Sequence, residues 1–170
     1  MTTSDVESRL LTVADAARYR TVRLEALELS PEAYGSSYEQ ESAQPLSWFE
    51  QRVSQSDIFG AFVGGELCGT AGFVIQESPK KRHKGLLWGM YVRPAARNSG
   101  LGRRLVEAVL QHASTRAVEL VDLTVVSENL PARRLYESLG FVEYGLEKMS
   151  LKLSGRYYDE ILMVKYLTPA

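Results

Sequence analysis

Polar and apolar positions follow a helical spacing in the first part of the chain. Within residues 16–29 the apolar side chains recur every three or four positions, as they do along one face of a helix. Thr12 and Asp15 have the spacing of a capping pair before this segment, and Ser30-Pro31 ends the pattern. The sequence therefore predicts an amphipathic helix here, with a short strand around 8–11 before it.

The pattern then changes to shorter segments. A short helix is predicted over 47–53, opened by the capping box of Ser47 and Glu50, after a polar stretch at 32–45. Two further helices are predicted, one from Gly100 to 110 and one between Pro131 and Gly140. Short apolar runs rich in β-branched and aromatic residues predict strands at 58–63, 67–75, 86–92, 118–126, 141–149 and 158–167.

Turn signals connect several of these strands. Gly64-Gly65 and Ser154-Gly155 lie where two hairpins are expected, and no repeat or linker interrupts the order. We therefore expect an α/β fold, in which a mixed sheet of about seven strands is flanked by about four helices. The whole chain, residues 1–170, is expected to be one domain with its core at about 8–167.

Composition removes several classes of function. Lysine and arginine total 20 and aspartate and glutamate total 21, so the net charge is 20 − 21 = −1. A chain with this net charge lacks the positive electrostatic field that is typical of proteins that bind nucleic acids or membrane surfaces. In addition, no apolar run is long enough to span a bilayer. With the single cysteine Cys68 and only His83 and His112, the usual zinc ligand sets cannot be assembled, so no metal is expected. A reducing, cytoplasmic location follows.

One turn carries candidate chemistry. Arg97, Asn98, Ser99, Gly100, Leu101 and Gly102 leave the end of a predicted strand and open a predicted helix. Unpaired N–H groups at a helix start attract anions, and glycines allow a phosphate to approach closely. The dinucleotide fingerprint fails because position 105 is leucine, and no Gly-Lys-Ser/Thr follows for a P-loop. The alternative is that both glycines only serve a tight turn.

At this turn the chain resembles the GNAT superfamily of acetyl-coenzyme A dependent N-acetyltransferases, whose signature reads strand, Pro, Arg/Gln-x-x-Gly-x-Gly/Ala, helix. Residues 129–141 resemble the superfamily's second block, and the order of elements from about Ser8 to Leu167 matches its fold. The segment 19–41 is similar to a bacterial branch whose substrates are mostly unassigned. The resemblance implies a mostly antiparallel sheet that is splayed in the middle.

It also implies where acetyl-CoA, the expected cosubstrate, binds. The pantetheine arm would lie in a gap between the strands 86–92 and 118–126, along Met90, Tyr91 and Val92, with the pyrophosphate on residues 97–102 and Arg103. Gly89 suits a bulge that turns the Met90 N–H towards the acetyl carbonyl. The alternative is that Gly89 only accommodates packing under a helix.

Asn129 and Tyr136 are seven residues apart, nearly two helical turns, so both can face one ligand if a helix begins near Asn129. In the superfamily the matching tyrosine often donates a proton to the departing thiolate, and the asparagine binds the pantetheine or holds neighbouring backbone. Tyr136 could instead be a half-buried core residue. Because Cys68 lies in an apolar run, we expect direct transfer in a ternary complex without an enzyme nucleophile.

The acceptor is expected to be a primary amine of a small molecule, a protein N-terminus or a lysine. The candidates for its pocket are Tyr34, Tyr157 and Tyr158, and those for the base are Glu25, Glu28, Asp159, Glu160 or water. The basic run 80–84 could meet an acidic partner or simply be a solvated loop. A homodimer is possible through the apolar strand 161–167, although burial within one chain explains that strand equally well. A catalytically silent CoA-binding regulatory module remains the alternative function.

Overall fold

The computed structural model describes residues 5–167, in which seven strands form one sheet. Residues 1–4 and 168–170 of the expected domain lie outside the described residues. The sheet order is β1-β2-β3-β4-β5-β7-β6, and every neighbouring pair is antiparallel except β4 and β5. This confirms the mixed, mostly antiparallel sheet. The strands are β1 (Val6–Leu10), β2 (Asp57–Val63), β3 (Glu66–Ile75), β4 (Lys84–Val92), β5 (Leu120–Val126), β6 (Val142–Leu153) and β7 (Arg156–Tyr166).

Five α-helices accompany the sheet in the described part of the chain, one more than the approximate four expected. They are α1 (Ala16–Leu29), α2 (Tyr38–Ser42), α3 (Leu46–Gln55), α4 (Leu101–Ser114) and α5 (Leu130–Ser138). The additional helix, α2, lies in the polar stretch and is too short to show a hydrophobic period. The expected capping box at Ser47 is wrong, because α3 begins at Leu46 with the extended residue Pro45 as its N-cap.

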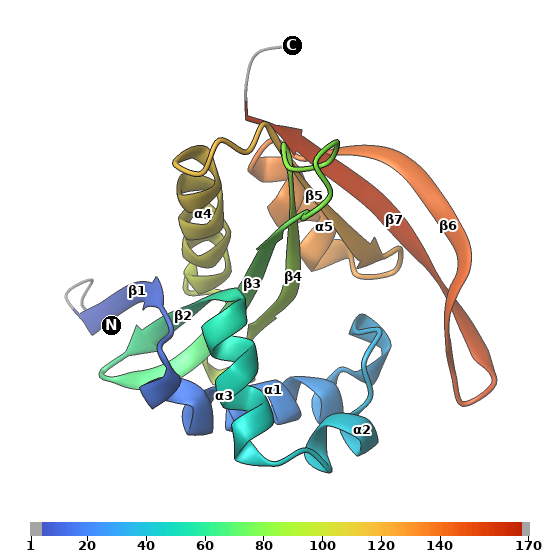
Figure 1. Ribbon diagram of the computed structural model, residues 1–170. Coiled ribbons are helices and arrows are strands. Elements are labelled where there is room, and N and C mark those ends of the chain that lie inside the picture. Colours follow the sequence, from blue (N-terminus) through green and yellow to red (C-terminus); the bar gives the residue numbers. More distant parts are fainter. Residues whose placement is uncertain (1–4, 168–170) are drawn as a thin grey trace.

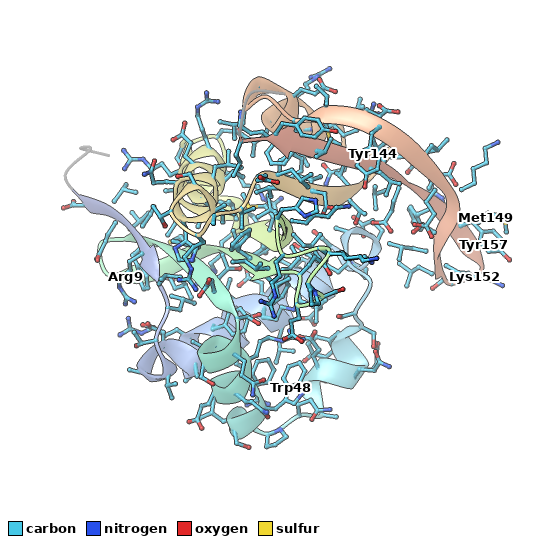
Figure 2. The ribbon with its side chains drawn as sticks, turned by 45° about the horizontal axis from the view of Figure 1, so that its top comes forward. Arg9, Trp48, Tyr144, Met149, Lys152 and Tyr157 are labelled. Atoms are coloured by element: carbon cyan, nitrogen blue, oxygen red, sulfur yellow. The ribbon has the colours of Figure 1, made fainter. Side chains whose placement is uncertain are left out.

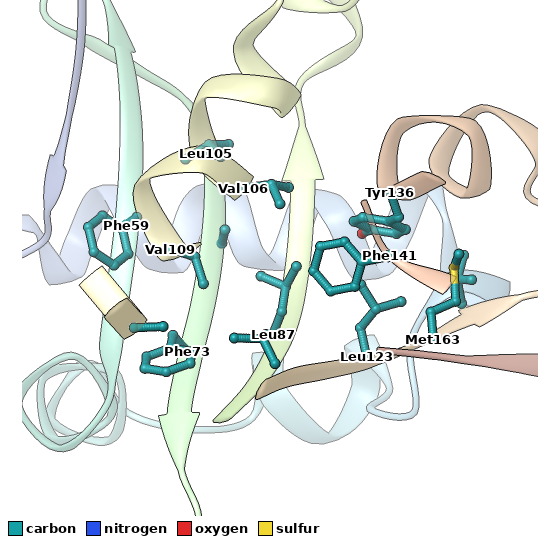
Figure 3. Close-up of a cluster of buried hydrophobic side chains, with 14 of the residues drawn as sticks. Phe59, Phe73, Leu87, Leu105, Val106, Val109, Leu123, Tyr136, Phe141 and Met163 are labelled. Atoms are coloured by element: carbon teal, nitrogen blue, oxygen red, sulfur yellow. The ribbon is translucent and has the colours of Figure 1, made fainter. Parts of the chain in front are cut away.

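The helices form layers on both faces of the sheet. Helices α4 and α5 contribute to one buried cluster with the central strands, and α1 and α3 contribute to a second cluster with β2 and β3 (Figure 1). In the first cluster Leu105, Val106 and Val109 of α4 are fully buried against the sheet, and Tyr136 and Phe141 lie at the end away from Phe59 (Figure 3). Burial of such side chains is the main stabilising contribution to the fold.

Local signals in the sequence account for several boundaries. The Thr12 N–H donates to the Asp15 carboxylate at 2.8 Å before α1, as the capping pair predicts. Gly64 and Gly65 have φ values of 56° and 82°, the left-handed region that a two-residue hairpin turn requires. Among residues 5–167, no helix is long and apolar enough to cross a membrane.

The last two strands form a long hairpin that extends beyond the rest of the sheet (Figure 1). Strand β7 lies inside the sheet between β5 and β6, and its Ile161, Met163 and Val164 are buried. Burial within one chain therefore accounts for the apolar character of this strand. Strand β6 is the sheet edge, and Val142, Tyr144 and Leu146 are exposed along it.

Candidate active site

Strands β4 and β5 pair only briefly before they separate. Residues 84–86 pair with residues 120–122, and beyond this point β4 pairs only with β3 and β5 only with β7. The facing edges of the two strands are therefore left without a strand partner in the middle of the sheet. Because unpaired main-chain groups need hydrogen-bond partners, this splay can hold an extended ligand that bears amides.

A β-bulge lies in β4 beside the splay. The register of β3 and β4 shifts there, so that Gly89 and Met90 together face the single residue Ala71. The φ of Gly89 is 61°, a left-handed value that glycine adopts without steric cost. The structure thus confirms the bulge predicted at Gly89.

The turn between β4 and α4 exposes a run of main-chain donors. After the 3₁₀ turn η4 (Pro94–Ala96), α4 begins at Leu101 with Gly100 as its N-cap. Within residues 5–167, the N–H groups of 98–103 have no protein acceptor, and the first helical bond runs from Arg104 N–H to Gly100 O at 3.1 Å. Gly100 has φ 82°, and a Cβ added to it would meet nothing within 4 Å. These donors and the open space above them fit a phosphate group.

Gly102 connects this turn to the bulge. A Cβ added to Gly102 would lie 3.2 Å from Leu135 Cδ2 and 3.3 Å from Met90 Cε, so any larger residue would require these two side chains to shift by a few tenths of an ångström. The turn at 97–102, the bulge and α5 are thus packed closely together.

The basic residues near the turn are partly engaged by the protein. Arg97 Nε donates to the Val92 carbonyl at 2.9 Å. Arg103 donates to Ser138 Oγ at 3.1 Å and pairs with Glu107 at 3.2 Å. The Val92 carbonyl, one of the groups expected to bind the pantetheine arm, is therefore already an acceptor for Arg97.

Tyr136 projects from α5 into the core at the splay. Its side chain packs edge-to-face on Phe141, with the ring centroids 5.8 Å apart. Burial raises the pKa of Tyr136 above its ordinary value, so the phenol keeps its proton at neutral pH. The hydroxyl has no hydrogen-bond partner among residues 5–167, yet it is not fully enclosed by protein. It is therefore free to donate to a ligand.

Asn129 is the N-cap of α5, as the spacing to Tyr136 required. Its Oδ1 accepts a hydrogen bond from the Ala132 N–H at 3.3 Å. Asn129 thus holds neighbouring backbone, which is one of the two expected roles, and its amide NH₂ makes no further bond in the described part of the chain.

Tyr34 closes the site from the side of α1. It follows the 3₁₀ turn η3 (Pro31–Ala33), which contacts β5 and β6. Its hydroxyl donates to the Met90 carbonyl at 2.8 Å, directly at the bulge. Burial raises the pKa of Tyr34; Arg23 lowers it, and the nearby Tyr136 phenol raises it further. The structure therefore brings together Tyr34, Met90 and Tyr136, which are far apart in the sequence.

Sequence reasoning missed a buried ionic cluster next to Tyr34. Arg23 of α1 donates two hydrogen bonds to Glu41 of α2, at 2.9 and 3.0 Å, and Arg52 of α3 donates a third at 3.2 Å. The Arg23 guanidinium lies 5.3 Å from the Tyr34 ring and 5.9 Å from the Trp88 ring. One signal in the sequence could have indicated this cluster. Arg23 is a cation among the apolar positions of α1, and such a cation is expected to have a buried partner.

Three of the four expected acceptor-side carboxylates are either engaged by the protein or exposed on its surface. Glu25 accepts from the Tyr91 hydroxyl at 2.9 Å and from Arg93 at 2.8 Å, and Arg93 also pairs with Glu66 at 2.8 Å. Glu28 is exposed on the surface of α1. Asp159 is also engaged, since it accepts from the Met149 N–H at 2.8 Å.

The hairpin residues are spread along β7. Glu160 pairs in register with Val126 at the end of β5, and its carboxylate accepts a hydrogen bond from Ser150. Tyr157 lies with Lys152 at the outer end of the hairpin (Figure 2), and Tyr158 is covered by Arg156, whose Cζ is 4.6 Å from the ring centroid. Glu160 is thus placed near the end of the splay, whereas Tyr157 is remote from it.

No group of three or more metal-ligating side chains occurs among the described residues. The thiol of Cys68 is half-buried, and burial raises its pKa, with Glu66 adding to the shift. A thiol with a raised pKa is a weak nucleophile at neutral pH.

Comparisons with known proteins agree with this geometry. Residues 23–141 match the family model described as acetyltransferase (GNAT) family. The chain is 23% identical over 155 residues to the L-amino acid N-acetyltransferase AaaT of Escherichia coli, covering 89% of this chain and 94% of AaaT. It is 47% identical over 58 residues to the mycothiol acetyltransferase of Thermomonospora curvata, a match of 34% of this chain but only 20% of that longer protein.

The fold is shared with solved structures. A structure of yncA from Salmonella typhimurium with its cofactor acetyl-CoA superposes with a TM-score of 0.81 at 23% identity, covering 98% of this chain and 96% of that one. The matched residues include the second half of α1 from Arg23, the bulge, the turn at 97–102 and α5. The chain therefore belongs to the acetyltransferase (GNAT) family of acetyl-CoA-dependent acyltransferases.

Proposed function

We propose that this protein is an N-acetyltransferase that moves the acetyl group of acetyl-CoA directly to a primary amine in a ternary complex. The observation that carries the proposal is the unpaired run of main-chain donors at residues 98–103, which lies beside the splay and its bulge. The pyrophosphate would bind this run, assisted by Arg97 and Arg103, and the pantetheine arm would follow the free edge of β4 along Met90, Tyr91 and Val92.

Acetyl-CoA supplies an activated acetyl group on a thioester. In the transfer, a C–N bond forms, the C–S bond breaks, the amine loses one proton and the sulfur gains one. The Met90 N–H at the bulge would donate to the acetyl oxygen as negative charge develops there. Tyr136, whose hydroxyl is protonated and without a protein partner, would give the proton to the sulfur.

The other expected residues take supporting positions. Asn129 would position the coenzyme arm through its free NH₂ while its Oδ1 caps α5. Glu160 of β7, which pairs with Val126 at the end of β5, remains a candidate base together with solvent. No covalent acetyl-enzyme is needed, which agrees with the raised pKa of the Cys68 thiol. The name of one relative gives an L-amino acid as its substrate and the name of another gives mycothiol, so the names leave the amine open.

The experiment is an assay of thiol release from acetyl-CoA in the presence of pooled amino acids, amines and peptides, with mass spectrometry of the products. We expect at least one amine to gain the mass of an acetyl group, with stoichiometric release of the thiol. Coenzyme binding with thiol release no faster than background hydrolysis, for every amine, would instead identify a silent CoA-binding regulatory module. Failure to bind acetyl-CoA at all would overturn both functions.

A homodimer forms part of the same proposal. It is supported by the exposed apolar side chains of Val142, Tyr144 and Leu146 along the edge strand β6. Light scattering during size-exclusion chromatography measures the mass in solution, and we expect twice the 19.0 kDa of one chain.

A further inference from the structure

Arg23 has an unused hydrogen-bonding edge although its side chain is only 6% exposed. A guanidinium carries five N–H donors in a fixed plane. Arg23 uses its side edge for Glu41, with Nε donating to Oε2 and Nη2 donating to Oε1. Its end edge, formed by Nη1 and the second hydrogen of Nη2, has no acceptor among residues 5–167. A nearly buried charged donor in this state indicates a missing partner.

The free edge faces the bulge. A Cβ added to Gly89 would lie 3.6 Å from Arg23 Nη1, and apart from its chain neighbours Trp88 and Met90 no other described residue would come within 4 Å of it. Nη1 is also not sealed inside the protein, because Arg20 Nε is the enclosed polar side-chain atom without a partner in the described residues. Arg23 therefore points at the place where Gly89 and Met90 would meet the acetyl group.

The guanidinium is held in this orientation by its surroundings. The rings of Tyr34 and Trp88 lie within cation–π distance of Arg23, and Tyr34 is itself fixed to the Met90 carbonyl. The two hydrogen bonds to Glu41 fix the opposite edge. The end edge is thus preorganised, as a planar fork that matches the two oxygens of a carboxylate.

Charge balance also favours an anion here. Arg23 and Arg52 both pair with the single carboxylate of Glu41, so two positive charges share one negative charge in a buried cluster. The carboxylate of Glu25, two residues along α1, contacts Arg93 and Tyr91 and neither arginine of this cluster. A bound carboxylate would balance the cluster.

We propose that Arg23 binds the carboxylate of the acceptor, and that the acceptor is a free amino acid whose amine lies on the carbon next to that carboxylate. The inference rests on the proposed acetyl transfer and names its substrate class. The short distance between Nη1 and the bulge requires the carboxylate to lie close to the attacking amine. A lysine side chain or a protein N-terminus has no such carboxylate and would leave the Arg23 edge unpaired.

The test compares free L-amino acids with the corresponding amino-acid amides, which keep the amine and side chain but lack the negative charge. We expect the wild-type protein to favour the preferred acid over its amide by about tenfold or more in kcat/KM. In Arg23→Lys, which keeps a cation beside Glu41 but removes the planar fork, this ratio should fall by about tenfold, chiefly through KM.

The matched control is Arg52→Lys. It changes the same pairing with Glu41, but the structure gives Arg52 no contact with Gly89. We expect Arg52→Lys to retain the preference for the acid, with both variants melting as single cooperative transitions. Equal loss of the preference in both variants would show that disruption of the cluster, and not the Arg23 fork, is responsible.

Binding gives a readout that does not depend on turnover. Ligand-observed NMR with the CoA-loaded protein should show the acid, but not its amide, binding to wild type, and the difference should vanish in Arg23→Lys. Equal turnover and binding of acid and amide by wild type would overturn the inference even if acetyl transfer is confirmed. If no amine is acetylated but the acid binds through Arg23, the proposed function fails and the carboxylate site stands.

Discussion

The hydroxyl of Tyr34 donates a hydrogen bond of 2.8 Å to the carbonyl oxygen of Met90. These residues are 56 positions apart in the sequence, and the bond joins the segment after α1 to the bulge of β4. It holds the main chain on which the proposed oxyanion donor lies. The proposed acceptor side, at Tyr34, is thus hydrogen-bonded directly to the proposed reacting centre at Met90.

Replacing Tyr34 with phenylalanine removes this bond and leaves the partly buried Met90 carbonyl without its partner. We expect Tyr34→Phe to lower the free energy of unfolding by about 1–2 kcal/mol and to lower kcat severalfold, while acetyl-CoA affinity stays within about twofold. Urea titration, steady-state kinetics and calorimetry measure the three quantities. Tyr38→Phe is the control, because Tyr38 is exposed on α2 and its loss should change none of them.

Tyr136→Phe tests the general acid. The ring and its contact with Phe141 remain, so we expect acetyl-CoA to bind as in wild type while kcat falls by about 10²–10⁴-fold. Because burial raises the pKa of Tyr136, its proton stays on across the neutral range, and wild-type kcat should not decline through this group below about pH 10. Unchanged turnover in the variant, with chemistry shown to be rate-limiting, would remove Tyr136 from the mechanism.

Gly100 and Gly155 allow conformational strain to be separated from ligand binding. Their φ values are 82° and 81°, and a Cβ added to either glycine would meet nothing within 4 Å. Gly100→Ala and Gly155→Ala should therefore each lower the free energy of unfolding by a similar amount, about 1 kcal/mol. Only Gly100→Ala should weaken acetyl-CoA, by about tenfold, since only Gly100 lies at the proposed phosphate site. Equal dissociation constants for the two variants would contradict this placement.

Asp15 links stability to pH. Hydrogen bonds from Arg9, opposed by burial, lower the pKa of Asp15 from its ordinary 3.8 to about 2. The folded state therefore binds its proton less readily than the unfolded state, so the stabilisation is complete above about pH 4 and is lost as the pH falls towards 2. We expect Asp15→Asn to lower the free energy of unfolding by about 1–2 kcal/mol at pH 7. The difference between wild type and variant should become smaller as the pH falls. Urea unfolding between pH 7 and pH 3 measures it, and a constant difference would refute the linkage.

Much of the local structure could be predicted from residue type and spacing. Glycines at 64, 65, 89, 100 and 155 have positive φ values, and each occupies a turn, bulge or helix cap that the sequence indicated. The helix caps at Asp15 and Asn129 follow from short-range hydrogen bonds between nearby residues. Such features can be predicted from the sequence because a few consecutive residues contain every atom that determines them.

Other features depended on contacts between distant segments. Helix α2 has no hydrophobic period, and its Glu41 is paired with Arg23 and Arg52 from two other helices. The sequence could not distinguish Glu25 from a surface carboxylate, because its contacts with Tyr91 and Arg93 join segments that are far apart in the chain. The same holds for Tyr157, whose distance from the splay follows from the length of the β6–β7 hairpin (Figure 2).

The sequence by itself determined most of the elements, their order, the glycine turn before α4 and the bulge, because backbone conformation and hydrophobic period are properties of neighbouring residues. The family resemblance implied a gap between these two strands, but only the tertiary structure decided that the gap opens after the pair of Leu86 and Asp122 and that Arg23 turns a free edge towards Gly89. Both depend on how three helices and the sheet pack, and packing is set by the shapes of many distant side chains at once.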